Sequence, residues 1–138
     1  MMKSLYCIRN AQNNRQIITS IGREQINSLR FGWTTKNNIE LVVTDNTKKS
    51  MKTAEMIFDG KPIIPLNLQS ITSNSDKKLN MFYHFLKNRE ECMIAYVGHG
   101  KFINYIKCTD LYYNSSVDIK RVHPYLVELT FQKDLCDN

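Results

Sequence analysis

The chain has 138 residues, of which 42% are hydrophobic and 23% are charged, and its formal net charge is +6. These proportions are typical of one folded domain and argue against a disordered chain. No apolar run approaches the roughly 20 residues that a membrane-spanning helix needs, and the apolar stretch near the N-terminus is too short for a signal peptide. We therefore expect a single compact domain over residues 1–138, located in the cytoplasm and away from membranes.

The positive charge comes mostly from lysines spread along the chain, with one denser patch at Lys48, Lys49 and Lys52. A nucleic-acid-binding domain usually adds interleaved aromatic residues or a recognisable reading module, and the sequence has neither, so we expect no nucleic-acid partner. A pocket for an anionic small ligand would contribute charge of the same sign. A composition rich in Asn, Lys and Ile explains the charge equally well.

The four cysteines are scattered without a C-x-x-C pair, and the three histidines are also dispersed. A zinc site needs clustered ligands, so this spacing predicts reduced cysteines, no metal site and no cofactor.

Short apolar runs alternate with amphipathic stretches along the chain. The apolar runs predict strands at 5–8, 39–45, 61–68, 92–98 and 124–131. The amphipathic stretches predict helices at 20–31, 47–58, 77–88 and 101–113. Two prolines make 61–68 a short or edge strand, and the last strand is also expected at an edge. Asp45 or Asn46 is expected to cap the second helix. This alternation predicts an α/β fold with three layers, α/β/α, and a mostly parallel sheet.

Three loops that follow predicted strands carry unusual polar residues. Arg9 and Asn10 follow the first strand, residues 44–46 end the second with Lys48 and Lys49 just beyond, and Gly98-His99-Gly100 follow the strand at 92–98. Parallel sheets place their sites where loops leave the carboxyl ends of the strands. We therefore expect these three loops to form one site.

Four short motifs in the same order make the chain resemble the histidine phosphatase superfamily, whose fold is called phosphoglycerate-mutase-like. That family opens with a strand and Arg-His-Gly, and this chain has Arg9-Asn10-Ala11 there. Its Gly-x-x-Gln helix start is matched by residues 22–25, and its Ser-His-Gly by residues 98–100. Its Ser-rich turn, arginine and Thr-Ala resemble residues 42–57, with Lys49 at the arginine position, or Lys48 if the turn shifts by one.

The resemblance also implies the chemistry of each position. In the family the first histidine attacks phosphorus, while two arginines and a second histidine hold the phosphoryl oxygens. By resemblance Arg9, Lys49, His99 and Asn10 bind phosphate, and Asn10 and His99 occupy the catalytic positions, with Asn10 in place of the nucleophile. An amide nitrogen has its lone pair delocalised, so Asn10 can donate hydrogen bonds but cannot form a phosphoenzyme.

The family commonly uses a carboxylate to protonate the leaving group, and its position should fall in residues 66–72. That segment contains Gln69 and Ser70 but no carboxylate, and Asp76 is a nearby substitute.

The resemblance therefore implies a catalytically degenerate protein, a pseudophosphatase, that keeps a cationic pocket for phosphate or a phosphorylated small molecule or protein. A scaffold for a protein partner, with a vestigial site, is a further reading. The alternative is an active phosphomonoesterase or phosphohistidine phosphatase with a non-standard nucleophile, either His99 or an activated water.

Overall fold

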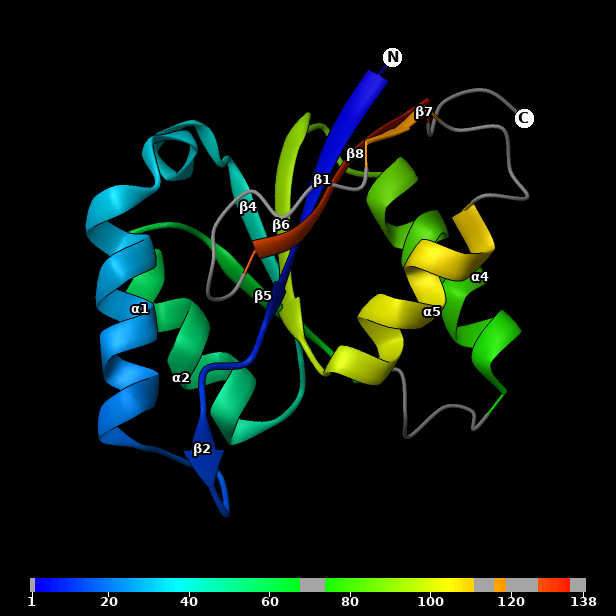
Figure 1. The fold of residues 1–138 in the computed structure, drawn as a ribbon. Coiled ribbons are helices and arrows are strands. Elements are labelled where there is room, and N and C mark those ends of the chain that lie inside the picture. The colour runs from blue at the N-terminus through cyan, green and yellow to red at the C-terminus, as the bar shows by residue number, and fades with distance from the viewer. Residues whose placement is uncertain (1, 68–73, 111–115, 119–126, 135–138) are drawn as a thin grey trace.

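The central feature of the fold is a mixed sheet, which the computed structural model shows within the described residues 2–67, 74–110, 116–118 and 127–134 (Figure 1). Its strands are β1 (Met2–Arg9), β4 (Leu41–Asp45), β5 (Ile63–Leu66), β6 (Met93–Gly98), β7 (Ser116–Asp118) and β8 (Val127–Asp134). They lie in the order β5-β4-β6-β1-β8-β7. The first four strands in this order are parallel, while β8 runs antiparallel to both of its neighbours. The predicted mostly parallel sheet is confirmed.

Helices cover both faces of the sheet (Figure 1). The helices α1 (Ser20–Gly32) and α2 (Lys48–Ile57) lie on one face, and α4 (Ser75–Lys87) and α5 (Gly100–Asp110) lie on the other. This is the three-layer α/β/α arrangement that the alternation of apolar and amphipathic stretches predicts. In the part of the chain that the structure describes, no helix is both long and apolar enough to cross a bilayer.

The strand β6 shows why its residues form a central strand. Ala95 and Val97 join the apolar cluster under α1 and α2, whereas Ile94 and Tyr96 join the cluster under α4 and α5. Successive side chains of a strand point to opposite faces, so a strand that is covered on both faces must be apolar throughout. All four of these side chains are buried, and β6 lies between β4 and β1.

Two features differ from the sequence-based expectations. The last strand does not lie at the edge, because β8 pairs with β1 on one side and with β7 on the other. A short hairpin, β2 (Asn13–Asn14) and β3 (Ile17–Ile18), and a 3-10 helix, η1 (Thr34–Asn38), were not predicted. The hairpin turn has positive φ angles at Arg15 and Gln16, where most turns of this kind carry glycine or asparagine, so the sequence lacks the usual turn signal. The strand β5 does lie at the edge, as its prolines predict.

Candidate functional site

The polar loops that follow β1, β4 and β6 meet at one edge of the sheet. The three strands are parallel and adjacent, so their carboxyl ends point the same way. Arg9 lies opposite Gly98 in the β1–β6 register, and the backbone N–H of Asn10 donates to the carbonyl of Gly98 at 3.2 Å. The structure therefore brings the first and third predicted loops into direct contact.

The guanidinium group of Arg9 lies against the first turn of α5. A Cβ built on Gly100 would stand 3.1 Å from its Nη1, and Nη2 donates to Oδ1 of Asn104 at 3.4 Å. Gly100 directly follows His99, so the cation of Arg9 lies beside the backbone of the loop that carries His99.

The side chain of Asn10 is oriented by α2. Its Oδ1 accepts a hydrogen bond from the Oγ hydroxyl of Ser50 at 2.5 Å, and Ser50 is fully buried in the first turn of the helix. With the carbonyl oxygen engaged, the group that Asn10 has left to offer a ligand is the Nδ2 amide, which is a donor only.

Neighbouring helices hold the backbone of the turn after Asn10. The N–H of Ala11 donates to Oγ1 of Thr53 at 3.3 Å, and the N–H of Gln12 donates to Oε1 of Gln25 at 2.9 Å. The start of α1 can approach this turn closely because residue 22 is glycine. Any other side chain would place a Cβ that overlaps the carbonyl oxygen of Gln12. The Gly-x-x-Gln motif at 22–25 thus positions the Arg9–Asn10 turn.

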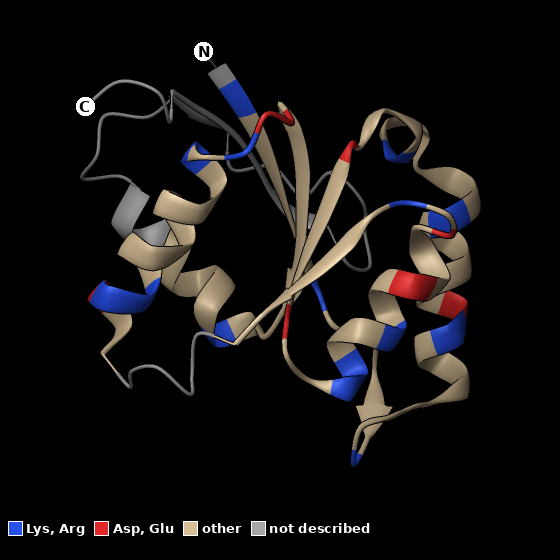
Figure 2. Cartoon of the chain, turned by 180° about the vertical axis from the view of Figure 1, so that it is seen from behind, with Lys and Arg blue, Asp and Glu red and all other residues tan. Residues whose placement is uncertain are grey.

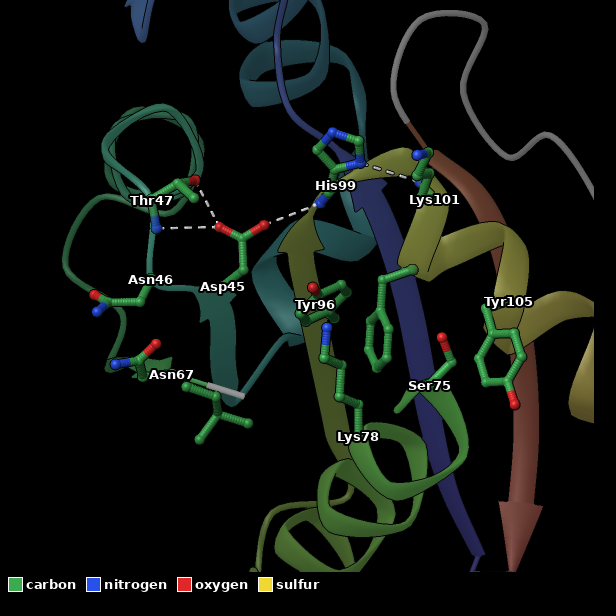
Figure 3. Close-up of a pocket in the computed structure, with 12 residues that line it drawn as sticks. Asp45, Asn46, Thr47, Asn67, Ser75, Lys78, Tyr96, His99, Lys101 and Tyr105 are labelled. Atoms are coloured by element: carbon green, nitrogen blue, oxygen red, sulfur yellow. Dashed lines mark hydrogen bonds between the residues drawn. The ribbon is translucent and has the colours of Figure 1, made fainter. Parts of the chain in front are cut away.

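Asp45 is a site residue whose role sequence reasoning missed. It does not cap α2, because Thr47 is the N-cap residue and accepts from the N–H of Ser50. Its Oδ1 accepts from the N–H and the hydroxyl of Thr47, at 3.2 and 2.6 Å, and its Oδ2 accepts from the N–H of His99 at 3.1 Å (Figure 3). The carboxylate therefore ties the end of β4 to the end of β6 and places a negative charge beside His99.

His99 presents a hydrogen-bond donor to the solvent side of the site. Its Nδ1 accepts from the backbone N–H of Lys101 at 3.2 Å (Figure 3), so the proton of the neutral ring is carried by Nε2. The residue is exposed, which leaves Nε2–H accessible to a ligand.

Lys49 lies in the first turn of α2, next to Ser50, and its backbone N–H donates to Oε1 of Gln16 at 3.0 Å. Figure 2 shows basic segments at the start of α2 and a red segment at the end of β4. Lys49 is half-buried, and within the described residues its ammonium group forms no hydrogen bond or ion pair with Arg9, Asn10 or His99. The alternative match, Lys48, is exposed.

A cavity of about 350 Å³ opens beside His99, between the ends of β4 and β5 and the starts of α4 and α5 (Figure 3). Asp45 and His99 line one side, and Lys78 and Tyr96 line another part. Arg9 and Asn10 lie outside this lining, so His99 is the predicted residue that borders both regions. Burial raises the pKa of the Tyr96 phenol well above its ordinary value, and the nearby charges of Asp45 and Cys7 raise the pKa further.

By sequence, the chain matches no protein-family model and no curated protein. By structure, it is similar to the phosphoserine phosphatase of Entamoeba histolytica in complex with 3-phosphoglyceric acid, with a TM-score of 0.62, 14% identity, and 96% of this chain and 98% of that chain covered. A mutant of that protein in complex with phosphoserine has the same TM-score at 15% identity, with 92% and 96% covered. The phosphoglycerate mutase of Plasmodium falciparum has a TM-score of 0.57 and 18% identity, with 80% and 70% covered. The chain has the fold of the histidine phosphatase superfamily.

The residues considered as leaving-group acids on this fold have different outcomes. Gln69 and Ser70 lie outside the described residues. Asp76 is exposed in the first turn of α4 and accepts a hydrogen bond from the hydroxyl of Tyr105. Asp76 is not among the residues that line the cavity, whereas its neighbour Ser75 and its partner Tyr105 are.

Proposed function

We propose that the protein is a pseudophosphatase that binds the phosphoryl group of a small phosphorylated molecule at Arg9, Asn10 and His99 and does not transfer it. The solved complexes of the Entamoeba phosphatase hold phosphoserine and 3-phosphoglyceric acid, which supports a phosphorylated small molecule as the ligand class.

The observation that carries this proposal is that three side chains with donor groups come from adjacent strand ends at one edge of the sheet. Arg9 supplies a permanent cation with a planar fork. The Oδ1 of Asn10 is engaged by Ser50, which leaves the Nδ2 amide. His99 accepts at Nδ1, which leaves Nε2–H. Phosphate oxygens are acceptors, so three donors at one strand edge suit phosphate binding.

The same hydrogen bonds argue against chemistry at this site. The amide nitrogen of Asn10 has no free lone pair with which to attack phosphorus. His99 could attack only through a nitrogen lone pair, and Nδ1 uses its lone pair on the N–H of Lys101. Loss of a covalent nucleophile reduces rate by about 10⁴ to 10⁶ in well-studied covalent enzymes.

Lys49 adds positive charge from the first turn of α2 in this proposal. Three backbone N–H groups at this helix start are already taken up, by Asp45 at Thr47, by Gln16 at Lys49 and by Thr47 at Ser50. In this proposal α2 therefore contributes to phosphate binding through the Lys49 side chain rather than through these three amides.

Binding can be tested by thermal unfolding with inorganic phosphate against chloride at matched ionic strength. At 10 mM phosphate and a Kd of about 1 mM, the stabilisation is about 1.4 kcal/mol, or about 5 °C in Tm for a chain of this size. Arg9→Ala should abolish the shift. Arg30→Ala is the matched control, because Arg30 lies in the last turn of α1 and pairs with Asp59.

Turnover can be tested by hydrolysis of p-nitrophenyl phosphate. The wild-type chain should show none, whereas Asn10→His should gain measurable hydrolysis, because the Ser50 hydroxyl can accept from Nδ1 of the new ring and leave Nε2 free to attack. Wild-type turnover that survives in Asn10→Ala and disappears in His99→Ala would establish the alternative, an active phosphatase with a non-standard nucleophile. Absence of any phosphate-dependent shift would reject the phosphate site and favour a scaffold for a protein partner.

A further inference from the structure

The turn of the β2–β3 hairpin has a backbone conformation that its residues do not favour. Arg15 and Gln16 have φ angles of 50° and 74°, so both lie in the left-handed region. A two-residue hairpin turn of this kind normally carries asparagine or glycine, and long side chains are strained there. Such strain persists where the surrounding structure fixes it, and it is common at functional positions. The turn therefore indicates that these two side chains do more than close the hairpin.

Gln16 fastens the hairpin to α2. Its Oε1 accepts from the backbone N–H of Lys49 at 3.0 Å, which holds the tip against the first turn of the helix. Arg15 is exposed and forms no hydrogen bond or ion pair within the described residues. Figure 2 shows basic segments at the tip of the hairpin and at the start of α2, at the same end of the molecule. The strained turn thus presents an open cation near the lysines of α2.

A groove of about 420 Å³ lies between the hairpin tip and α2. Lys48 and Lys52 line it from one face of the helix, four residues apart. Both are exposed, and neither forms an ion pair in the part of the chain that the structure describes. Met51 adds an apolar surface to the lining, and Glu55 adds a carboxylate. Because the described lining carries two ammonium groups and one carboxylate, the groove keeps a positive charge, and Arg15 adds to it.

The lining favours an acidic polypeptide over a nucleic acid. Single-stranded nucleic acids stack their bases on aromatic side chains, and no aromatic residue lines this groove among the described residues. Next to the tip, the exposed apolar side chains are aliphatic, namely Ile17 and Ile21, which are 71% and 53% exposed. Methionine and isoleucine suit contact with the apolar side chains of a polypeptide, while the cations attract its carboxylates.

We propose that the β2–β3 hairpin tip and the adjacent face of α2 form a docking surface for an acidic segment of a protein partner. Arg15, Lys48 and Lys52 attract the carboxylates of this segment, and Met51 contacts its apolar side chains. The surface goes beyond the proposed phosphate site, because none of the three side chains that bind the phosphoryl group lines the groove.

The test measures the fluorescence anisotropy of labelled probes at low ionic strength, where charge attraction is little screened. The acidic probe is a ten-residue peptide with blocked ends that contains five glutamates, three serines and two leucines. The neutral probe has glutamine at each glutamate position. The third probe is a thymidine hexanucleotide, whose five phosphates carry the same charge as the acidic peptide. The wild-type chain should bind the acidic peptide about 10-fold or more tightly than the neutral one, and more tightly than the hexanucleotide.

Substitutions at the hairpin tip and in α2 separate binding from folding. Arg15→Asn removes the charge and supplies a residue that tolerates positive φ, so Tm should rise by about 2 °C. In the same variant, affinity for the acidic peptide should fall by about 3- to 5-fold. Lys52→Gln should weaken that peptide to a similar extent. Lys36→Gln is the matched control, because it removes the same charge from η1, before the amino end of β4, and it should change no affinity.

Three outcomes would overturn this docking surface. Equal affinity for the acidic and neutral peptides would exclude recognition by charge. Unchanged affinity in either Arg15→Asn or Lys52→Gln would place the peptide outside the groove. Tighter binding of the hexanucleotide than of the acidic peptide would make this a nucleic-acid surface. The phosphate-dependent shift in Tm is measured separately, so its absence would reject the phosphate site and leave the docking surface standing.

Discussion

Substitution of alanine for Gly98 tests the packing that brings Tyr96 to the site. The added Cβ would lie 2.7 Å from Cε2 of Tyr96, which is closer than two carbon atoms can approach without displacement. Gly98 does not have a positive φ, so alanine meets no backbone strain there. The ring has little room to move, because it is 2% exposed and packs against Phe82 and Phe102.

Overpacking of this kind typically destabilises a protein by about 1–3 kcal/mol. For 138 residues, the entropy of unfolding is about 0.29 kcal/mol/K, so Gly98→Ala should lower Tm by about 3–10 °C. The measurement is thermal unfolding followed by circular dichroism, with urea denaturation to obtain the free energy of unfolding.

A double-mutant cycle assigns the loss to the ring. In a Tyr96→Val background the space over residue 98 is open, so adding Gly98→Ala should change the free energy of unfolding by no more than about 0.5 kcal/mol. The reasoning is wrong if Gly98→Ala leaves Tm unchanged in the wild type. It is also wrong if the substitution has the same effect in both backgrounds, because the loss would then come from the backbone.

Three further substitutions have definite expected outcomes. Asp45→Asn should tighten phosphate binding by about 3- to 10-fold in calorimetry, because it removes about 1 kcal/mol of repulsion beside His99. Its one oxygen can still accept from the His99 N–H, whereas its NH2 group then faces the donors of Thr47, so Tm should fall. Unchanged phosphate affinity would place the phosphate elsewhere. Lys3→Met should lower the free energy of unfolding, measured in urea, by about 1–3 kcal/mol. The buried Lys3 ammonium group donates to the carbonyls of Leu86 and Arg89, at and just after the end of α4, and both would lose this partner. An unchanged free energy of unfolding would contradict this role. Arg89 donates hydrogen bonds to Glu91, and these bonds, together with the positive charge of Arg89, lower the pKa of Glu91 in the folded state. The pair therefore stabilises the folded state fully at pH values above the ordinary glutamate pKa. This stabilisation is lost as pH falls through the lower pKa of the folded state. Glu91→Gln should therefore flatten the stability curve in that acidic range, and an unaltered curve would refute the assignment.

Much of the fold can be predicted from local patterns of apolar and polar residues in the sequence. The continuous apolar run at 92–98 predicts a strand covered on both faces, and β6 is such a strand. The amphipathic stretch at 20–31 predicts α1 to within one residue at its end. These predictions succeed because hydrophobic periodicity is a property of neighbouring residues, and burial of one face or both follows directly from it.

The meeting of Arg9, Asn10 and the residues around His99 was also predictable. Each follows a parallel strand, and parallel strands with helical connections have their carboxyl ends at one edge. The position of Lys49 was predicted from motif spacing alone, and spacing places a backbone rather than a side chain. Its contribution to phosphate binding stays a prediction.

The sequence by itself thus determines the three layers, the parallel core of the sheet and the location of the site. These three features depend on the short-range periodicity of apolar residues and on the direction of the chain. Long-range contacts decide the rest. The pairing of β8 between β1 and β7 depends on which strand finds which partner, and an apolar run does not encode that choice. Asp45 resembles a helix cap in sequence, yet its carboxylate binds the backbone of His99, 54 residues away. Tyr96 has the period of a core residue, and only the missing side chain at Gly98 lets its hydroxyl reach the cavity.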